Sequence, residues 1–337
     1  MNTSIKRVAF VDIAKGLAII SVIIGHCVAL GSFTRTLIFS FHMPLFFIMT
    51  GYTTKLADSW DKLWKKTGKD AKKLLLLAVL MLIVYDILII IKYRSFSKYG
   101  LKLNFGPLPA QLFWATGYNT AGHPNLGIPW FFVSMFWGRF LCNVIFRLTK
   151  NENASIVIFL VLGIFGLTFN DSRMLPQNLD VTFVAMMFMA AGMLLKKLDN
   201  HLADKEKQRK VVSVSMFAVS AFIWAFCLYH GWFIEMAARR YDHFLVCAIE
   251  AICATYVIIV LSKLIEKIPV ASDTFVTVGQ ASLYILVCHY FDGFLDPVLL
   301  PLGTFISTAI KIVLDVSLGT GYLFAKKKIR EKTKPEA

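Results

Sequence analysis

The sequence has few charged residues for its length. Only 17% of its 337 residues are Asp, Glu, Lys or Arg, whereas a soluble globular protein has about 25%. The same chain is 57% hydrophobic, with a mean hydropathy of +0.64. This combination excludes an ordinary soluble protein and indicates one that is embedded in a membrane.

The sequence also lacks the motifs of soluble-type enzymes. It has no nucleophile elbow around a serine or cysteine, no glycine-rich phosphate loop and no metal-ligand spacing. Its six cysteines lie in apolar stretches without a CxxC pair, which argues against a disulfide framework and a zinc site. We therefore expect no metal cofactor and no soluble-type hydrolase or kinase chemistry.

A net charge of +15 does not by itself indicate a nucleic-acid partner. The lysines and arginines fall in short clusters between apolar segments, which is the pattern of a membrane protein rather than of a basic groove. No RNA-binding signature or helix-turn-helix is visible. We expect no nucleic-acid partner.

Ten apolar segments approach the roughly 20 residues that a bilayer span needs. They begin near residues 8, 36, 74, 129, 154, 179, 211, 243, 275 and 304. The first segment is too long and too charged for a signal peptide, and no small-residue cleavage site follows it. The expected fold is an all-α integral membrane protein, a bundle of about ten transmembrane helices in a single domain over residues 1–337.

The distribution of basic residues predicts the orientation of these spans. If the N-terminus is cytoplasmic, the inner loops hold 25 Lys and Arg and the outer loops hold eight. Basic residues favour the cytoplasmic side, so both termini are predicted there, including a basic tail at about 325–337. The longest outer loop, about 92–128, is rich in Gly, Pro, Asn and aromatic residues, and is a candidate binding surface.

The first apolar segment, Val8–Leu30, carries three titratable residues on one helix face. Lys15 and His26 are eleven residues apart, about three turns, and Asp12 precedes Lys15 by about one turn. Such residues are costly inside a bilayer, so a functional role is the default hypothesis. The alternative is that Asp12 and Lys15 simply neutralise each other.

Three histidines fall at a similar predicted depth in the outer half of the membrane. His26 belongs to the first span, His42 to the second and His289 to the ninth. Imidazole can exchange a proton near neutral pH, which suits a general base. Pro44 is expected to kink the second span beside His42. A packed or interfacial role remains the alternative for each histidine.

Other charged residues inside spans need partners. Lys311 and Asp315, four residues apart in the tenth span, are interpreted as a pair that compensates itself. Glu250, Arg139 and Asp86 also lie within spans, where unpaired burial would be costly. Their partners cannot be identified from the sequence.

Two segments resemble the opening of the membrane-bound acyltransferase-3 family, with its fucose 4-O-acetylase-like branch as the best match. These are FVDIAKGLAIISVIIGH (Phe10–His26) and FHMPLFFIMTGY (Phe41–Tyr52). Weaker similarity continues through PWFFVSMFWGRFL (Pro129–Leu141), LDVTFVAMMFMAAGMLLKK (Leu179–Lys197) and VGQASLYILVCHYF (Val278–Phe291).

The resemblance implies about ten spans and transfer of an acyl group, usually acetyl from acetyl-CoA, to a hydroxyl of a surface polysaccharide or related glycan. The first span of the family usually carries Arg, ten residues and then His. Lys15 and His26 occupy these positions here. Lysine keeps the charge but lacks the planar fork of arginine. In the ninth segment, Gln280 and Ala281 replace a basic and an amide residue.

On this basis we assign His26, His42 and Lys15 to catalysis. His26 is the expected base for the sugar hydroxyl, His42 would orient or polarise a reacting group, and Lys15 would attract the phosphates of CoA from the cytoplasmic side. About 16 Å of helix separates Lys15 from His26, a span that an extended pantetheine arm could bridge. The expected binding residues are Asp12, Lys15, Trp130, Arg139 and His289.

The expected partners are an acyl-CoA co-substrate such as acetyl-CoA, a glycan or sugar acceptor and the lipid bilayer of the plasma membrane; self-association into a homo-oligomer stays open. A small-molecule transporter is the main alternative, since ten spans with buried charges also suit a solute pathway. A transporter would more often show paired repeats or broken helices in matching positions, and only the second span has a clear break. A scaffold or receptor would not need His, Lys and Asp aligned within a span.

Overall fold

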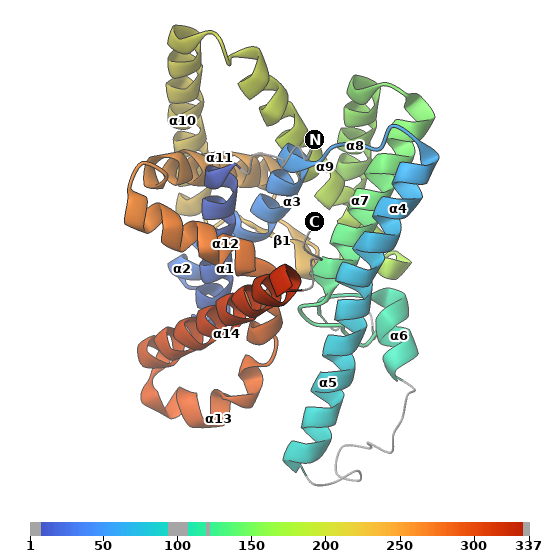
Figure 1. Cartoon of the computed structure of the whole chain (residues 1–337), viewed down its shortest axis with the longest axis vertical. Coiled ribbons are helices and arrows are strands. Elements are labelled where there is room, and N and C mark those ends of the chain that lie inside the picture. The colour runs from blue at the N-terminus through green and yellow to red at the C-terminus, as the bar shows by residue number, and fades with distance from the viewer. Residues whose placement is uncertain (1–7, 94–106, 119–121, 333–337) are drawn as a thin grey trace. The chain divides into compact units, whose positions relative to one another are not determined.

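The computed structural model describes residues 8–93, 107–118 and 122–332, and it is built almost entirely from helices (Figure 1). Some of the charged residues that were used to predict the topology lie outside these ranges. They are Lys6, Arg7, Arg94, Lys98, Lys102 and those at the end of the basic tail.

Within the described residues, eight helical segments are long and apolar enough to cross a membrane. They are α1 (Ala9–Cys27), α2 with α3 (Phe33–Phe39 and His42–Thr53), α7 (Trp130–Thr149), α9 (Leu179–His201, with the preceding 3₁₀ turn Pro176–Asn178), α10 (Glu206–Tyr229), α11 (Leu245–Ile265), α12 (Pro269–His289) and α14 (Thr304–Lys332). The prediction of an all-α membrane protein is confirmed, and the protein is a multi-pass one.

The two other predicted spans are also helical. α5 runs over Leu76–Tyr93, and α8 over Glu152–Gly166 has only 15 residues. One face of α8 is nevertheless apolar and exposed, because Val157, Val161 and Phe165 follow one another at four-residue intervals and are 50–59% exposed. The count of ten spans and the cytoplasmic termini stay predictions.

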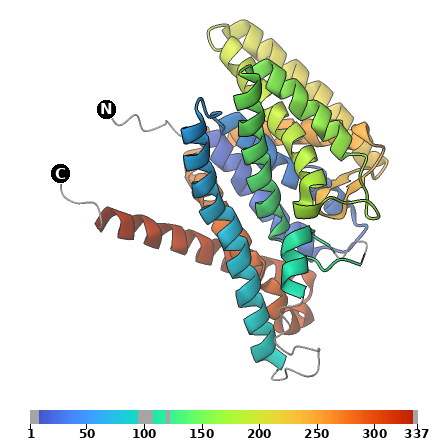
Figure 2. The ribbon, with the colours of Figure 1, turned by 90° about the vertical axis from the view of Figure 1, so that its right-hand side faces the viewer.

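The remaining elements are short. They are α4 (Trp60–Asp70), a π-helical turn (Ala71–Leu75), α6 (Pro107–Trp114), α13 (Asp296–Leu299), the hairpin of β1 (Ile234–Glu235) and β2 (Arg240–Tyr241), and 3₁₀ turns at Met236–Ala238, Asp292–Phe294 and Leu300–Leu302. Figure 2 shows α4, the π turn and α5 as one continuous rod.

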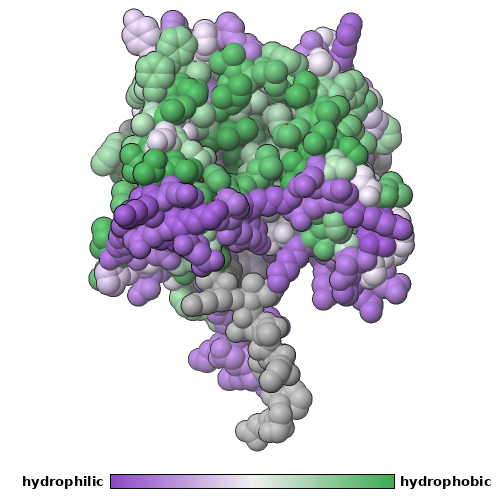
Figure 3. Space-filling model, turned by 90° about the horizontal axis from the view of Figure 1, so that it is seen from above, coloured by the Kyte–Doolittle hydropathy of each residue, from purple (hydrophilic) through white to green (hydrophobic). Residues whose placement is uncertain are grey.

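The chain divides into two compact units. Unit 1 contains residues 1–49, 207–233 and 249–337, and unit 2 contains residues 50–206 and 234–248. We describe each unit by itself. Figure 3 shows one face of the molecule, where hydrophobic side chains gather over a broad area and hydrophilic ones gather apart from them, as expected for a protein in lipid.

Glycines allow close helix packing in unit 1. α12 packs against α1 on one side and α14 on another. A Cβ at Gly16 would lie 2.6 Å from the backbone oxygen of Phe275, and a Cβ at Gly279 would overlap the backbone oxygen of Asp12. Gly319 of α14 packs in the same way on Ile285. Small residues at such crossings bring transmembrane helices together, and here they hold α1, α12 and α14 close to one another.

The second predicted span is divided into α2 and α3. The chain leaves α2 at Ser40 and Phe41, and Pro44 lies in the first turn of α3. Proline is tolerated there because the first backbone N–H groups of a helix have no intrahelical acceptor. The interruption predicted beside His42 is therefore present, but it lies at Ser40 and Phe41, directly before the histidine, and Pro44 itself stands in the first turn of α3.

In unit 2, α9 packs against α7 and α8, and a buried arginine ties the hairpin to the start of α9. Arg239 Nε lies 2.6 Å from Asp180 Oδ2, with both side chains fully buried. Arg239 also donates to Asn178 Oδ1 at 2.7 Å and to Thr116 Oγ1 at 3.1 Å. The sequence places Arg239 among the loop charges, whereas the structure makes it the centre of a buried polar network.

Candidate active site

The three predicted histidines come together in unit 1. The rings of His26 and His289 have centroids 5.3 Å apart. Phe39 lies edge-on to His26 at 5.9 Å and to His42 at 4.6 Å, so its ring stands between these two histidines. The end of α1, the start of α3 and the end of α12 thus supply one histidine each.

These histidines differ in exposure. His42 and His289 are buried, with 4% and 5% of their surface exposed, whereas His26 is exposed. His42 Nδ1 lies 2.9 Å from the backbone oxygen of Ile38 and donates to it, which fixes its ring. An incoming molecule can reach His26 more readily than the other two.

Carboxylates hold the ring of His289. Its Nδ1 lies 2.9 Å from Asp292 Oδ2 and 3.5 Å from Asp315 Oδ2. A carboxylate on one imidazole nitrogen fixes the tautomer and orients the other nitrogen. The ligand atoms of His289, Asp292 and Asp315 all lie within 4.8 Å of one another, a spacing that could also hold a metal ion. The expectation of a metal-free site stays a prediction.

The predicted mutual pairing of Lys311 and Asp315 is wrong. Lys311 Nζ lies 2.7 Å from Asp296 Oδ1, and Asp315 lies near His289 instead. The reason is that α12 and α14 are packed together and α13 follows α12 closely, so each charge reaches a partner on another segment. Both residues are buried, at 7% and 3% exposure, which makes such partners necessary.

Arg35 is a further charge at this site. Its guanidinium stacks on Phe39 with the central carbon 3.9 Å from the ring centroid, and Nη1 donates to the backbone oxygen of Gly25 at 3.0 Å. Gly25 lies in the last turn of α1, where a cation interacts favourably with unpaired carbonyls. Arg35 thereby fixes the end of α1 next to His26.

Asp12 and Lys15 occupy the other part of α1. Asp12 is buried at 5% exposure and accepts a long hydrogen bond of 3.5 Å from Gln280 Nε2 on α12. Lys15 is half-buried. Gln280 also accepts a hydrogen bond from Lys327 Nζ at 3.1 Å, so this end of α1 shares a polar network with α12 and α14. The roles proposed for Asp12 and Lys15 stay predictions.

Trp130 and Arg139 belong to α7 in unit 2, whereas the histidine cluster belongs to unit 1. Trp130 is buried at the start of α7. Arg139 Nε lies 2.8 Å from Asp70 Oδ2, which supplies the partner that the sequence could not identify. This ion pair accounts for the charge of Arg139 without a ligand, and the binding role expected for Arg139 stays a prediction.

The described part of the long outer loop is ordered by local contacts. Gln111 of α6 donates to the backbone oxygen of Asn125 at 2.9 Å, and the rings of Trp114 and His123 stack with centroids 3.9 Å apart. Residues 94–106 and 119–121 of this loop lie outside the described residues.

The sequence did not indicate Asp292, Asp315 and Arg35 as site residues. Asp292 follows His289 by three residues, a spacing that brings side chains together on a helical turn, so this signal was present. Asp315 and Arg35 reach the histidines only through the packing of α14 and α2, and no spacing in the sequence could have shown it.

Comparison with known proteins identifies the family. The model of the acyltransferase-3 family, an acyltransferase domain, matches residues 8–319. The chain belongs to the acyltransferase-3 family. This match covers α1 to most of α14 and therefore includes every histidine of the cluster. No curated protein and no solved structure matches the chain. The protein is thus a membrane acyltransferase, and family membership does not favour the transporter alternative.

Proposed function

We propose that this membrane acyltransferase moves an acetyl group from acetyl-CoA to a hydroxyl of a cell-surface glycan, in the plasma membrane and in the manner of fucose 4-O-acetylase-like enzymes. The observation that carries the proposal is the histidine cluster. An exposed His26 lies beside His289, whose ring is held by Asp292, in a chain of the acyltransferase-3 family.

His26 is the general base of the proposed reaction. It takes the proton of the acceptor hydroxyl as the hydroxyl oxygen attacks the thioester carbonyl carbon. The new carbon–oxygen bond forms, the carbon–sulfur bond breaks, and CoA leaves as a thiolate that recovers the proton from His26. The rings of His289 and Phe39 lie next to the ring of His26.

Lys15 would attract the donor toward α1. A lysine presents a single strong positive charge to a phosphate and needs no planar match. Its place about three turns before His26 on the same helix allows one extended donor to contact both residues. Asp12, one turn before Lys15 on α1, is hydrogen-bonded to Gln280 of α12.

Membranes that contain the His26→Ala protein test the proposal directly. Transfer of labelled acetyl from acetyl-CoA to glycan should fall by about 100-fold or more, because a positioned general base contributes about 10²–10⁴-fold. His201→Ala, a change of an exposed histidine outside the cluster, should leave transfer unchanged. NMR of surface glycans, with and without the gene, would identify the acceptor. Full transfer by His26→Ala would refute the assigned base.

A further inference from the structure

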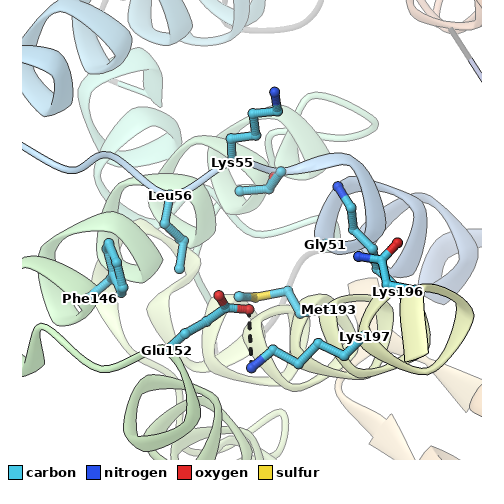
Figure 4. A pocket seen from close by; sticks show the side chains of 10 residues that line it. Gly51, Lys55, Leu56, Phe146, Glu152, Met193, Lys196 and Lys197 are labelled. Carbon is cyan, nitrogen blue, oxygen red and sulfur yellow. Dashed lines mark ion pairs between the residues drawn. The ribbon is translucent and has the colours of Figure 1, made fainter. Parts of the chain in front are cut away.

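A second candidate site lies in unit 2, where the ends of α3, α8 and α9 surround a cavity of about 320 Å³. The apolar part of its lining is formed by Leu56, Phe146 and Met193 (Figure 4). Its polar residues include Lys55, Lys196, Lys197 and Glu152. Three ammonium groups and one carboxylate give these residues a net charge of +2.

The wall of the cavity is held firmly in place. Residues 54–59 connect α3 to α4, and their backbone accepts or donates three hydrogen bonds to other segments. Lys66 donates to the backbone oxygen of Lys55 at 2.9 Å, the backbone N–H of Ala57 donates to Asn143 Oδ1 at 2.8 Å, and Arg147 donates to the backbone oxygen of Asp58. On the other side, Gly51 lets α3 pack directly on the backbone of Met189 in α9. The cavity is therefore a formed feature of unit 2.

The three lysines of the cavity differ in whether they have an ion-pair partner. Lys197 forms an ion pair with Glu152 at 3.2 Å, which Figure 4 shows as a dashed line, and donates to Asn153 at 2.6 Å. In the part of the chain that the structure describes, Lys196 has no carboxylate partner, although it is half-buried. Lys55 is exposed, and its ammonium group points away from Met193 in Figure 4. Lys196 is thus the cation most suited to meet an anion in the cavity.

We propose that this cavity binds the phosphate-ester end of a ligand that also has an apolar part. Lysine ammonium groups bind phosphate as point charges, and the apolar wall suits an adenine ring or an acyl chain. The predicted topology places the lysine clusters 55–73 and 196–210 on the cytoplasmic side, where both acyl-CoA and anionic lipid headgroups are found. A volume of about 320 Å³ is at the low end for ligand pockets, so only the phosphate-bearing end enters.

The first source of such a ligand is the acyl donor, bound here independently of the contact proposed for Lys15, and this form of the inference rests on the proposed function. The second source is an anionic phospholipid. The two are distinguished by binding measurements that do not depend on catalysis. The full-length protein in nanodiscs of neutral phosphatidylcholine is titrated with CoA by calorimetry, and the same protein is purified from anionic membranes and analysed for retained phospholipid by native mass spectrometry.

Lys196→Gln should weaken CoA binding roughly ten-fold, the equivalent of one lost charge-assisted hydrogen bond. Glu152→Gln should strengthen binding several-fold, since it removes the competing carboxylate beside Lys197. An increase of this kind would not follow from general damage to the fold. Lys207→Gln removes one charge from the same predicted cytoplasmic loop outside the cavity and should have no effect.

The outcomes separate the two hypotheses. A change of CoA affinity in the two cavity variants supports the donor as ligand, and a loss of retained anionic lipid in Lys196→Gln supports the lipid. Unchanged CoA affinity together with unchanged lipid retention overturns the inference. The proposed function is judged separately by acetyl transfer, and His26→Ala should bind CoA like the unmodified protein. Normal acetyl transfer together with an unchanged CoA affinity of Lys196→Gln would refute the donor as the ligand of the cavity and leave the proposed function intact.

Discussion

The environment of each titratable side chain distinguishes the members of the histidine cluster. His289 is buried and pairs with Asp292, whereas His26 is exposed and lies 5.3 Å away. An imidazole oriented by a carboxylate is a well-established way to support an adjacent catalytic group. In the proposed mechanism, Asp292 would act through His289, as a positioning residue rather than a catalytic one.

Asp292→Asn tests this role. The amide keeps the shape of the side chain but removes the charge that holds the Nδ1 proton of His289. We expect kcat for acetyl transfer to fall about 10- to 100-fold, the usual effect of losing a carboxylate behind a functional histidine, with a smaller change in KM. Steady-state kinetics in nanodiscs would measure both.

The control for this variant is Asp273→Asn, which changes an exposed carboxylate on α12 itself. It should leave kcat and KM unchanged. Thermal unfolding of both variants shows whether the fold is intact. An Asp292→Asn enzyme with normal kcat would contradict the positioning role of this residue.

At the scale of elements, the crossing of α1 and α12 determines where the site residues lie. Asp12 is on α1 and Gln280 on α12, and they meet because Gly279 lets the two backbones approach closely. His26 and His289 lie towards the C-terminal ends of the same two helices. A shift at the crossing would therefore be transmitted to the histidines.

Gly279→Ala should destabilise this crossing. The new methyl group would overlap the backbone oxygen of Asp12, and rigid backbone cannot move aside as a flexible side chain can. We expect a loss of roughly 1–3 kcal/mol in the free energy of unfolding and a large loss of acetyl transfer. Thermal unfolding in detergent and the transfer assay would report the two effects.

Gly321→Ala provides a matched comparison, since Gly321 is a helical glycine of α14 and an added Cβ there meets nothing within 4 Å. Alanine has the higher helix propensity, so this variant should be as stable as the parent or slightly more stable. Equal stability of the two variants would show that the close crossing is not required.

At the scale of the whole molecule, the asymmetry of basic residues should determine orientation in the membrane. Twenty-five Lys and Arg lie in one set of predicted loops and eight in the other, a difference that strongly favours cytoplasmic placement of the richer set. Arg239 of the poorer set is buried with Asp180 and does not contribute a free loop charge.

Reporter fusions test this orientation. A fluorescent protein attached after Ala337 should fluoresce, because that end of the chain is predicted to be cytoplasmic, and alkaline phosphatase attached there should be inactive. Alkaline phosphatase inserted after Asp171, between α8 and α9, should be active. The opposite pattern at either position would show that the predicted orientation is wrong.

The sequence by itself determined the class of the protein and the identity of its central histidines. Low charge and long apolar segments predict membrane-spanning helices, because a helix satisfies its backbone hydrogen bonds internally in lipid. The eight apolar helices of the described residues confirm the predicted all-α membrane class. His26, His42 and His289 could be selected because a titratable residue inside a span is costly and therefore informative. Their roles in catalysis stay predictions.

Only the tertiary structure decided which charges meet. Lys311 pairs with Asp296 rather than Asp315, Asp315 lies near His289, and Arg139 pairs with Asp70. Spacing along one helix predicts partners on that helix, whereas a buried charge takes whichever opposite charge the packing of several helices brings within reach. That packing depends on glycine contacts such as Gly279 on Asp12, which no periodicity in the sequence encodes.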